Sequence, residues 1–407
     1  MYINRLLEKE VIKYLERDEI IAIVGPRQAG KTTMIEYILS SIKNKNIKRI
    51  SFDDVKDKQL FVNDIDSFIK KYIEGTDILF IDEIHYAKNS GKQLKYIFDK
   101  YKNIKLIISG SSAVDISIQS LKYLVGRVLV FKLFPFSFEE FIRSKDEKLY
   151  DIYLDNKYKE DILKELNGYL KEYILFGGYP KINLTNNTDE KKFILNNLYN
   201  LYALKEVKDL LNLSDDFSIH NLLKALSLQT AEIVNYSEIG NLSNLKYHKI
   251  KRILNFFDKT FICKEVPPYF TNKRNEIVKS KKIFFYDLGL RNIIIDDFKE
   301  DISGHLYENA IFCELIKNNI EVKYWHTKVG AEVDFIIEKS GNLILIEVKG
   351  DLKQPKITRS MNSFIERYSP KEAYILTLNL DEKVIKDNIT INFIPYVKFI
   401  LKIKDFK

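Results

Sequence analysis

The sequence has few cysteines, glycines and prolines, and it has no long apolar run. Its two cysteines, Cys263 and Cys313, show no paired spacing, which argues against a disulfide framework or a zinc site and predicts that both are core residues. Only 15 Gly and 8 Pro argue against collagen-like or many-turned all-β architectures and favour a helix-rich α/β class. No run approaches the roughly 20 apolar residues of a membrane helix. The charged start, MYINRLLEKE, is unlike a signal peptide. We therefore expect a cytoplasmic protein with no membrane partner.

The chain has enough apolar residues to bury large cores. It contains 407 residues, of which 45% are hydrophobic, with 25 Tyr and 26 Phe. At roughly 100 to 200 residues per domain, this length predicts two to four units. The formal net charge is +8, and residues 241–282 alone carry 11 basic residues against three acidic ones. This local excess permits a polyanionic partner such as DNA.

A glycine-rich motif follows the first strand-like run. The run IIAIV at 20–24 leads into a loop that matches G-x-x-x-x-G-K-[ST] and then into a helical segment. In such a loop the backbone N–H groups face phosphate oxygens, Lys31 neutralises the β and γ phosphates, and the Thr32 hydroxyl coordinates Mg²⁺. The sequence therefore predicts binding of ATP with Mg²⁺ by Gly25, Pro26, Arg27, Gln28, Ala29, Gly30, Lys31, Thr32 and Thr33.

A second element agrees with this prediction. The run ILFIDEI at 78–84 is an apolar strand that delivers Asp82 and Glu83 at its carboxyl end, where open α/β sheets bind their ligands. We expect Asp82 to hold the Mg²⁺ shell and Glu83 to orient or deprotonate the attacking water. The pair predicts hydrolysis in addition to binding.

Three further residues are candidate catalytic groups. Ser109 and Ser111 follow the strand-like run KLIIS, and their hydroxyls could contact the γ-phosphate or the water, although serines in loops commonly only form turns. Arg127 precedes another strand-like run and could act as an arginine finger across a subunit interface, or be a surface charge. The finger would require a homo-oligomer.

These motifs resemble a known family. The segments GPRQAGKTT, LFIDEIH, ISGSS, LVGR, LFPFSFEEF and FGGYP are similar to those of prokaryotic AAA-type P-loop ATPases whose C-terminal region is catalogued as a domain of unknown function. The resemblance extends from about residue 5 to 360. It implies nucleotide hydrolysis and leaves the biological role open.

The basic segment is typical of a helix-turn-helix followed by a wing. Helices are expected around Gly240 and over 246–257, followed by a long hairpin over 261–287. In the second helix, Ile250, Leu254 and Phe257 share one face, which leaves His248, Lys249 and Arg252 off that stripe. DNA binding through Lys246–Lys282, with Lys273, Arg274, Lys279, Lys281 and Lys282 on the wing, is one interpretation. The other is an interdomain adaptor with solubilising lysines.

A strand pair near the C-terminus resembles the PD-(D/E)XK nuclease fold. A two-residue turn at Ser340-Gly341 places Asp334 opposite Glu347, with Cβ atoms about 5 Å apart. Two opposed carboxylates are destabilising unless a cation lies between them, so we expect a divalent metal bound by Asp334, Glu347 and Glu308, with Lys349 beside it. The alternative is a strand pair with a Glu332 to Lys349 salt bridge and solvated acids. The usual proline before the first acid is replaced by Val333.

Together these features predict an α/β protein in four parts. A P-loop AAA-type core with a parallel sheet is expected over 1–135, a helical lid or connector over 136–213, a winged-helix-like segment over 214–285 and a nuclease-like α/β domain over 286–407. The expected function is Mg²⁺-dependent ATP hydrolysis coupled to the C-terminal half, which would act on DNA. The alternative is a nucleotide switch that controls protein partners, with the nuclease-like fold as a scaffold.

Overall fold

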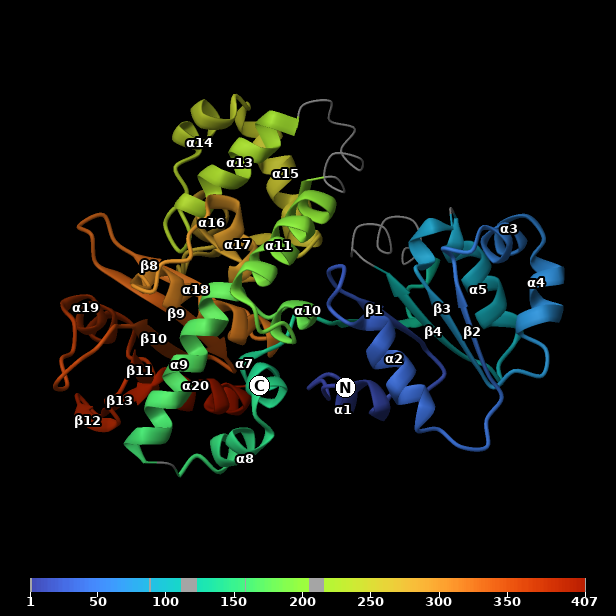
Figure 1. Cartoon of the computed structure of the whole chain (residues 1–407). Coiled ribbons are helices and arrows are strands. Elements are labelled where there is room, and N and C mark those ends of the chain that lie inside the picture. Colours follow the sequence, from blue (N-terminus) through green and yellow to red (C-terminus); the bar gives the residue numbers. More distant parts are fainter. Residues whose placement is uncertain (1, 88, 111–122, 158, 205–215, 407) are drawn as a thin grey trace. The chain divides into compact units, whose positions relative to one another are not determined.

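The chain forms two compact units. The computed structural model describes residues 2–87, 89–110, 123–157, 159–204 and 216–406 (Figure 1). The first unit comprises residues 1–136 together with 259–261, and the second comprises 137–258 and 262–407. The first unit thus ends one residue beyond the boundary expected at 135. The boundaries expected at 213 and 285 fall inside the second unit.

A five-stranded sheet forms the centre of the first unit. Its strands lie in the order β2-β3-β4-β1-β5, and every neighbouring pair is parallel. Every residue of β1 and β3 is buried, as expected for a parallel sheet covered on both faces. The predicted parallel sheet is confirmed, and its strands are β1 (Ile20–Val24), β2 (Ile47–Ser51), β3 (Ile78–Asp82), β4 (Lys105–Gly110) and β5 (Val128–Lys132).

Helix α2 (Lys31–Ser40) follows β1 and buries an apolar stripe against the sheet. Met34 and Ile35 of the second helix lie in the same core cluster as Ile21, Ile107 and Phe131 of the sheet. This core holds the loop between β1 and that helix in place. The described helices of the unit are α1 (Glu8–Lys13), α2 (Lys31–Ser40), α3 (Val55–Asn63), α4 (Ile65–Tyr72), the short 3₁₀ turn η1 (Ile84–Tyr86) and α5 (Ser90–Lys100).

The second unit begins with a helical segment. A capping box between Ser137 and Glu140 starts its first helix. The segment shares a core with the C-terminal part, since Glu314 accepts a hydrogen bond from the Phe138 amide at 3.1 Å and the Tyr153 hydroxyl donates to the Val397 carbonyl at 2.9 Å. The segment expected as a lid or connector therefore belongs to the second unit. Its helices are α7 (Phe138–Lys145), α8 (Glu147–Asp155), α9 (Glu160–Phe176), α10 (Pro180–Asn183), α11 (Thr188–Leu198) and the π-helical turn η4 (Tyr199–Leu204).

Three helices and two strands follow. The helices are α13 (Asp216–Leu228), α14 (Tyr236–Ser243) and α15 (Tyr247–Lys259), and the strands are β6 (Cys263–Val266) and β7 (Lys282–Phe285). The strands pair antiparallel, with Val266 opposite Lys282. The expected long hairpin is therefore a short ribbon whose connection contains helix α16 (Lys273–Val278), which carries Lys273 and Arg274. The ribbon leads into α17 (Leu288–Ile295) and α18 (Gly304–Lys317).

A six-stranded mixed sheet forms the C-terminal part, in the order β12-β13-β11-β10-β9-β8. The β9–β10 hairpin has the predicted register from Asn342–Lys339 to Ile346–Phe335. Both turn residues, Ser340 and Gly341, have positive φ, as a two-residue hairpin turn requires. The elements are β8 (Lys323–His326), β9 (Glu332–Lys339), β10 (Asn342–Val348), α19 (Arg359–Tyr368), β11 (Glu372–Thr377), β12 (Glu382–Lys386), β13 (Ile389–Pro395), α20 (Tyr396–Lys402) and η5 (Ile403–Phe406).

The two cysteines and the helix lengths bear on the earlier expectations. Cys263 and Cys313 are both buried and unpaired, which confirms them as core residues. Within the described ranges, no helix combines the length and the apolar character that a membrane crossing requires.

The FGGYP segment brings the end of α9 against the start of α17. Gly177 has φ +74°, and Asp287 accepts a hydrogen bond from the Gly178 amide at 2.7 Å. A side chain at Gly289 would place its Cβ only 2.1 Å from the carbonyl oxygen of Phe176. The two backbones can approach this closely only because Gly289 has no Cβ.

We expect Gly289→Ala to lower the free energy of unfolding by about 3 kcal/mol, because the added carbon meets backbone atoms that cannot rotate away. The matched control is Gly304→Ala, also in a helix, whose Cβ would meet nothing within 4 Å. That control should be neutral or slightly stabilising. Thermal and urea unfolding measure both. Equal stability of the two variants would contradict the close approach.

Candidate functional site

The loop between β1 and α2 curls around its own lysine. Lys31 donates hydrogen bonds from Nζ to the carbonyl oxygens of Gly25 and Pro26, both at 3.0 Å. A Cβ at Gly25 would lie 2.0 Å from the Leu133 carbonyl oxygen, so only glycine fits there. Gly30 has φ +89° and begins α2 without a side-chain cap. The first N–H groups of α2 therefore have no side-chain acceptor at the cap, as a phosphate site requires.

Asp82 is the centre of the hydrogen bonds at the carboxyl edge of the sheet. Thr32 Oγ1 donates to Asp82 Oδ2 at 2.6 Å, and Ser109 Oγ donates to Asp82 Oδ1. The Glu83 amide also donates to Asp82 Oδ1, at 3.0 Å. The structure thus brings together residues that the sequence places in three separate motifs.

Glu83 is held in an unusual backbone conformation beside the loop. Its φ is +51°, in the left-handed region, and its Oε2 lies 3.0 Å from His85 Nδ1. Burial would raise the pKa of Glu83, but the nearby His85 and the charges of Lys31 and Arg27 outweigh burial and keep the pKa below its ordinary value. At neutral pH the carboxylate is therefore ionised, the form that accepts a proton or orients a water.

Arg5 also supports the loop, and the sequence motifs gave no reason to single it out. Its buried guanidinium donates to the Ala29 carbonyl at 2.7 Å and to the Phe134 carbonyl at 2.6 Å. It thereby ties the phosphate-binding loop to the segment after β5. The positive charge also lies over the Phe136 ring, 4.9 Å from its centroid.

The remaining predicted residues have various positions. Arg27 lies 3.5 Å from the Tyr86 hydroxyl, Gln28 has φ +60°, and Thr33 is exposed at the start of α2. Ser111 lies outside the described residues. Arg127 immediately precedes β5, at the amino edge of the sheet, and pairs with Asp99 at 2.8 Å. Asp82 lies at the carboxyl end of its strand, whereas Arg127 lies at the amino edge of the same sheet. Arg127 is therefore not near the phosphate-binding loop of its own unit.

The groups around Asp82 fit a magnesium ion. Mg²⁺ prefers oxygen ligands and usually contacts one or two protein oxygens together with substrate phosphates. The Thr32 hydroxyl and the Asp82 carboxylate are 2.6 Å apart and provide two such oxygens next to Lys31. These are the two residues that would hold the ion.

We expect Arg5→Met to weaken ATP binding about tenfold, because the loss of a charge-assisted hydrogen bond loosens the loop by roughly 1.4 kcal/mol. Calorimetric titration with ATP measures the effect. The matched control, Arg17→Met, removes an exposed arginine that pairs only with the nearby Glu19 among the described carboxylates. Unchanged ATP affinity in Arg5→Met would refute the supporting role.

The second candidate site lies in the C-terminal sheet. Glu308 on α18, Asp334 on β9 and Glu347 on β10 come close enough for the charge of Asp334 to raise the pKa of both glutamates, in addition to the larger effect of their burial. Lys349 Nζ lies 2.8 Å from Glu347 Oε1. The structure therefore brings the four predicted residues together.

The expected metal site is not present in this arrangement. Across the described part of the chain, no group of three or more His, Cys, Asp or Glu residues has a geometry that could hold a metal ion. The carboxylates are occupied otherwise: Asp334 Oδ2 accepts from the Val348 amide at 2.7 Å, Glu347 accepts from the Thr358 hydroxyl at 2.8 Å, and Glu308 pairs with Lys282.

The alternative with a Glu332 to Lys349 salt bridge is also wrong. Glu332 pairs with Lys282, whereas Lys349 pairs with Glu347. Glu308 and Glu347 are buried, so these two acids are not solvated either.

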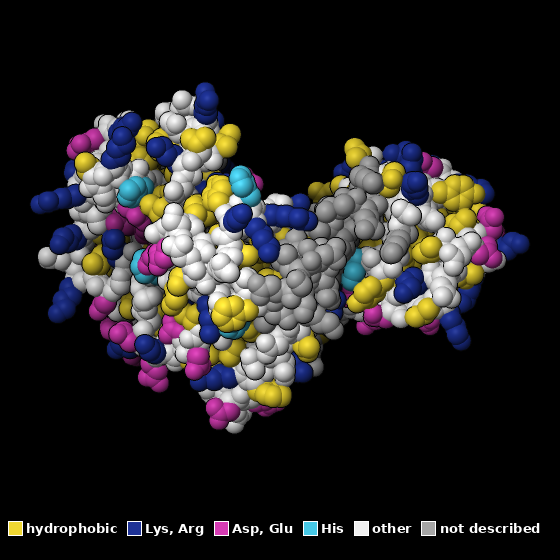
Figure 2. Space-filling model, turned by 90° about the horizontal axis from the view of Figure 1, so that it is seen from above, with side chains coloured by type: hydrophobic (Ala, Val, Ile, Leu, Met, Phe, Trp, Pro, Cys, Tyr) yellow, Lys and Arg dark blue, Asp and Glu magenta, His cyan; other side chains and the backbone are white. Residues whose placement is uncertain are grey.

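The basic segment is partly neutralised. On α15, Ile250, Leu254 and Phe257 are buried while His248, Lys249 and Arg252 are exposed, as predicted. Lys251 pairs with Glu265, and Lys273 pairs with Glu276 and Glu338. Lys282, expected on the wing surface, is 1% exposed and cannot contact DNA. Several Lys and Arg side chains still project from the face that carries α14 and α15 (Figure 2).

A cavity of about 430 Å³ lies beside this segment. Aromatic side chains and cations line it together, and its lining includes no carboxylate. Its residues include Phe270, Tyr324, Trp325 and Tyr368 with Lys279, Lys328 and Arg367.

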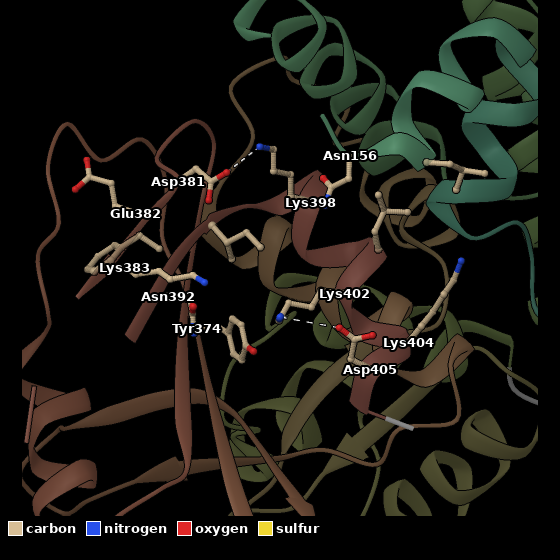
Figure 3. Close-up of a pocket in the computed structure, with 14 residues that line it drawn as sticks. Asn156, Tyr374, Asp381, Glu382, Lys383, Asn392, Lys398, Lys402, Lys404 and Asp405 are labelled. Carbon is tan, nitrogen blue, oxygen red and sulfur yellow. Dashed lines mark hydrogen bonds and ion pairs between the residues drawn. The ribbon is translucent and has the colours of Figure 1, made fainter. Parts of the chain in front are cut away.

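Another cavity, of about 460 Å³, lies between β12, β13 and α20 (Figure 3). Lys398 points toward Asp381 at 2.8 Å, and Lys402 toward Asp405 at 4.0 Å. Because two of its lysines face carboxylates of the same cavity, its local charge is largely balanced. No sequence motif maps to it.

Comparisons with known proteins divide the chain into three regions. Residues 17–142 match a family model described as an AAA domain, and residues 167–301 and 303–399 match two domains of unknown function, DUF8612 and DUF4143. With the parallel sheet and the loop motif, the first match shows an AAA-type P-loop ATPase domain. The DUF4143 match does not confirm a nuclease-like domain.

Relatives span nearly the whole chain. An uncharacterized protein of Haemophilus influenzae is 23% identical over 403 residues, which cover 95% of this chain and 96% of that protein. An uncharacterized protein of Methanocaldococcus jannaschii is 27% identical over 408 residues, covering 97% and 85% respectively. Among solved structures, the Walker-type ATPase of Pyrococcus abyssi has a TM-score of 0.47 at 15% identity, covering 72% of this chain and 96% of that chain.

Proposed function

We propose that this protein hydrolyses ATP with Mg²⁺ and that the nucleotide state controls what its C-terminal half binds. The observation that carries the proposal is the set of hydrogen bonds around Asp82, which joins Thr32 of the loop to Ser109 of the neighbouring strand. Thr32 and Asp82 would hold the ion, whose charge would stabilise the phosphate oxygens.

Each of the other groups has a role in this proposal. Lys31, now bonded to two loop carbonyls, turns to the β and γ phosphates when ATP enters. Glu83 accepts a proton from the attacking water or orients it, and His85 fixes the direction of the carboxylate. Ser109, bonded to Asp82, contacts the γ-phosphate or the water.

A homo-oligomer is part of the proposal. Arg127 lies at the amino edge of the sheet, opposite the phosphate-binding loop of its own unit. Its guanidinium is partly exposed and pairs with Asp99. If Arg127 left Asp99 and contacted a phosphate of the ATP bound by a neighbouring subunit, it would act as an arginine finger.

We expect Lys31→Ala to abolish ATP turnover, because the phosphates lose their positive charge. Glu83→Gln should bind ATP with an affinity close to that of the wild type and hydrolyse it roughly 10²- to 10⁴-fold more slowly, since the amide cannot accept the proton. Phosphate release and ATP titration measure the two effects.

The matched control for Glu83→Gln is Glu36→Gln, an exposed acid on α2. It should leave both binding and turnover unchanged. Hydrolysis by Glu83→Gln at the rate of the wild type would remove the role assigned to this carboxylate.

We further propose that the C-terminal half binds DNA through the segment Lys246–Lys282. Among the described carboxylates, none forms an ion pair with Lys246, Lys249, Arg252, Lys279 or Lys281, so these cations can contact phosphates. The adjacent cavity places aromatic rings beside Lys279, a combination that binds unpaired bases by stacking.

We expect DNA binding to weaken steeply as the salt concentration rises. The double variant Lys279→Glu, Lys281→Glu should reduce the slope of log K against log salt by roughly two, because about two phosphate contacts are lost. The control reverses Lys353 and Lys356, two exposed lysines outside the segment. Retention of labelled duplex and single-stranded DNA over a salt series measures both. Absence of binding at low salt, or equal loss in both variants, contradicts the DNA proposal.

One observation favours the alternative of a nucleotide switch for protein partners. The acidic cluster in the C-terminal sheet contains Lys282 instead of forming a metal-holding group. A nuclease-like fold without a metal would act as a scaffold. The same DNA measurement distinguishes the two functions.

A further inference from the structure

A buried lysine lies among the carboxylates that the sequence assigns to a metal ion. Lys282 Nζ lies 2.8 Å from Glu308 Oε1 and also contacts Glu332 Oε1. Lys282 is 1% exposed and Glu308 5% exposed, so the ion pair is shielded from water. The charge of Asp334 acts on the same ammonium group.

The ammonium group of Lys282 is held in its charged form. Burial alone would lower the pKa of Lys282, but the charges of Glu308, Asp334 and Glu332 outweigh it and keep the pKa above its ordinary value. The Tyr324 ring lies on another side, with its centroid 5.7 Å from Nζ. A buried charge surrounded in this way is costly to remove unless another cation replaces it.

The two carboxylates that contact Nζ, those of Glu308 and Glu332, are oxygen donors of the kind that divalent cations bind. Divalent ions bind carboxylate oxygens at about 2.0 to 2.6 Å, whereas the Nζ to oxygen distance at Glu308 is 2.8 Å. If the ammonium group were removed, the carboxylates of Glu308 and Glu332 would be free to close on a divalent ion as metal ligands. The ammonium and a metal ion cannot occupy this position together.

The lysine and the acids come from different regions of the chain. Lys282 is the first residue of β7, within the region that matches DUF8612, and Glu308, Glu332 and Asp334 lie within the region that matches DUF4143. Pairing of β7 with β6 and the isolated bridge from Lys282 to Ile233 fix the backbone of the lysine. The β6–β7 ribbon thus positions the ammonium group of Lys282 inside the acidic cluster.

The geometry points to Lys282 as the resident cation of this cluster: its ammonium stands where a divalent metal would stand and masks a latent metal site. This role goes beyond the ATPase proposed above, because it concerns the C-terminal sheet and needs no nucleotide. The ammonium group of Lys282 therefore neutralises the acids of the cluster with a charge from the same chain. The same contact joins the β6–β7 ribbon to the C-terminal sheet.

The test uses the full chain without nucleotide, titrated with Mn²⁺ and followed by calorimetry and by the electron paramagnetic resonance of free Mn²⁺. Wild type should bind no Mn²⁺ at this cluster up to roughly 1 mM. Lys282→Ala should bind one ion more per chain than wild type. Adding Glu308→Gln to that variant should abolish the extra site, and Lys281→Ala, which removes the preceding lysine, should behave as wild type.

Thermal unfolding provides a second readout. Without metal, Lys282→Ala should melt at a lower temperature than wild type, because the carboxylates have lost their cation. Mn²⁺ should raise the melting temperature of Lys282→Ala and leave that of wild type unchanged, since a ligand bound only by the folded state stabilises it. If the variant folds only with Mn²⁺ present, that rescue has the same meaning.

Two results would overturn the inference. The first is a Mn²⁺ ion bound by wild type and lost in Glu308→Gln, which would show that the lysine does not exclude the metal. The second is the absence of both extra Mn²⁺ binding and Mn²⁺ stabilisation in Lys282→Ala, which would show that no latent site exists.

Discussion

The proposed nucleotide site depends on the carboxylate of Asp82. Its two oxygens accept hydrogen bonds from Thr32, Ser109 and the Glu83 amide, so the phosphate-binding loop, the end of β4 and the acidic strand are joined at one side chain. This is possible because β4 lies between β3 and β1 in the sheet, which places the carboxyl ends of all three strands side by side (Figure 1). The order of the strands therefore builds the site, and Arg5 and Gly25 fit the loop against the segment after β5.

The second unit contains a cluster of acidic side chains and lysines in its C-terminal sheet. Four carboxylates, those of Glu308, Glu332, Asp334 and Glu347, lie near two ammonium groups, those of Lys282 and Lys349. Buried carboxylates are costly unless a cation or a proton compensates them. In this cluster the lysines pair with three of the acids, and burial raises the pKa of Glu308, Asp334 and Glu347 above their ordinary values.

Local patterns predicted the parallel sheet and the β9–β10 hairpin. Four strands of the parallel sheet, β1, β3, β4 and β5, were predicted from short apolar runs, and the β9–β10 register followed from the Ser340-Gly341 turn alone. The loop residues were predicted from the spacing of one strand-loop-helix unit, and Asp82 was predicted from a second apolar run that ends in two acids. These features depend on residues close together in the sequence.

Contacts between distant residues were not predictable in the same way. Arg5 reaches Phe134 and Lys282 reaches Glu308 only after folding, so no spacing reveals either pair. Lys282 was expected on a basic surface because it lies in a segment with many basic residues. Composition does not distinguish a buried lysine from an exposed one, and Lys282 is buried. The helix α16 within the expected hairpin was missed because the segment was assigned from its basic residues.

The most direct test of the central claim is phosphate release from ATP by the purified wild-type chain, measured with Mg²⁺ and again after the metal is chelated. The Asp82-centred site predicts steady multiple turnover with Mg²⁺ and none without it. Equal release in both conditions, or no release with saturating ATP and Mg²⁺, would contradict the account.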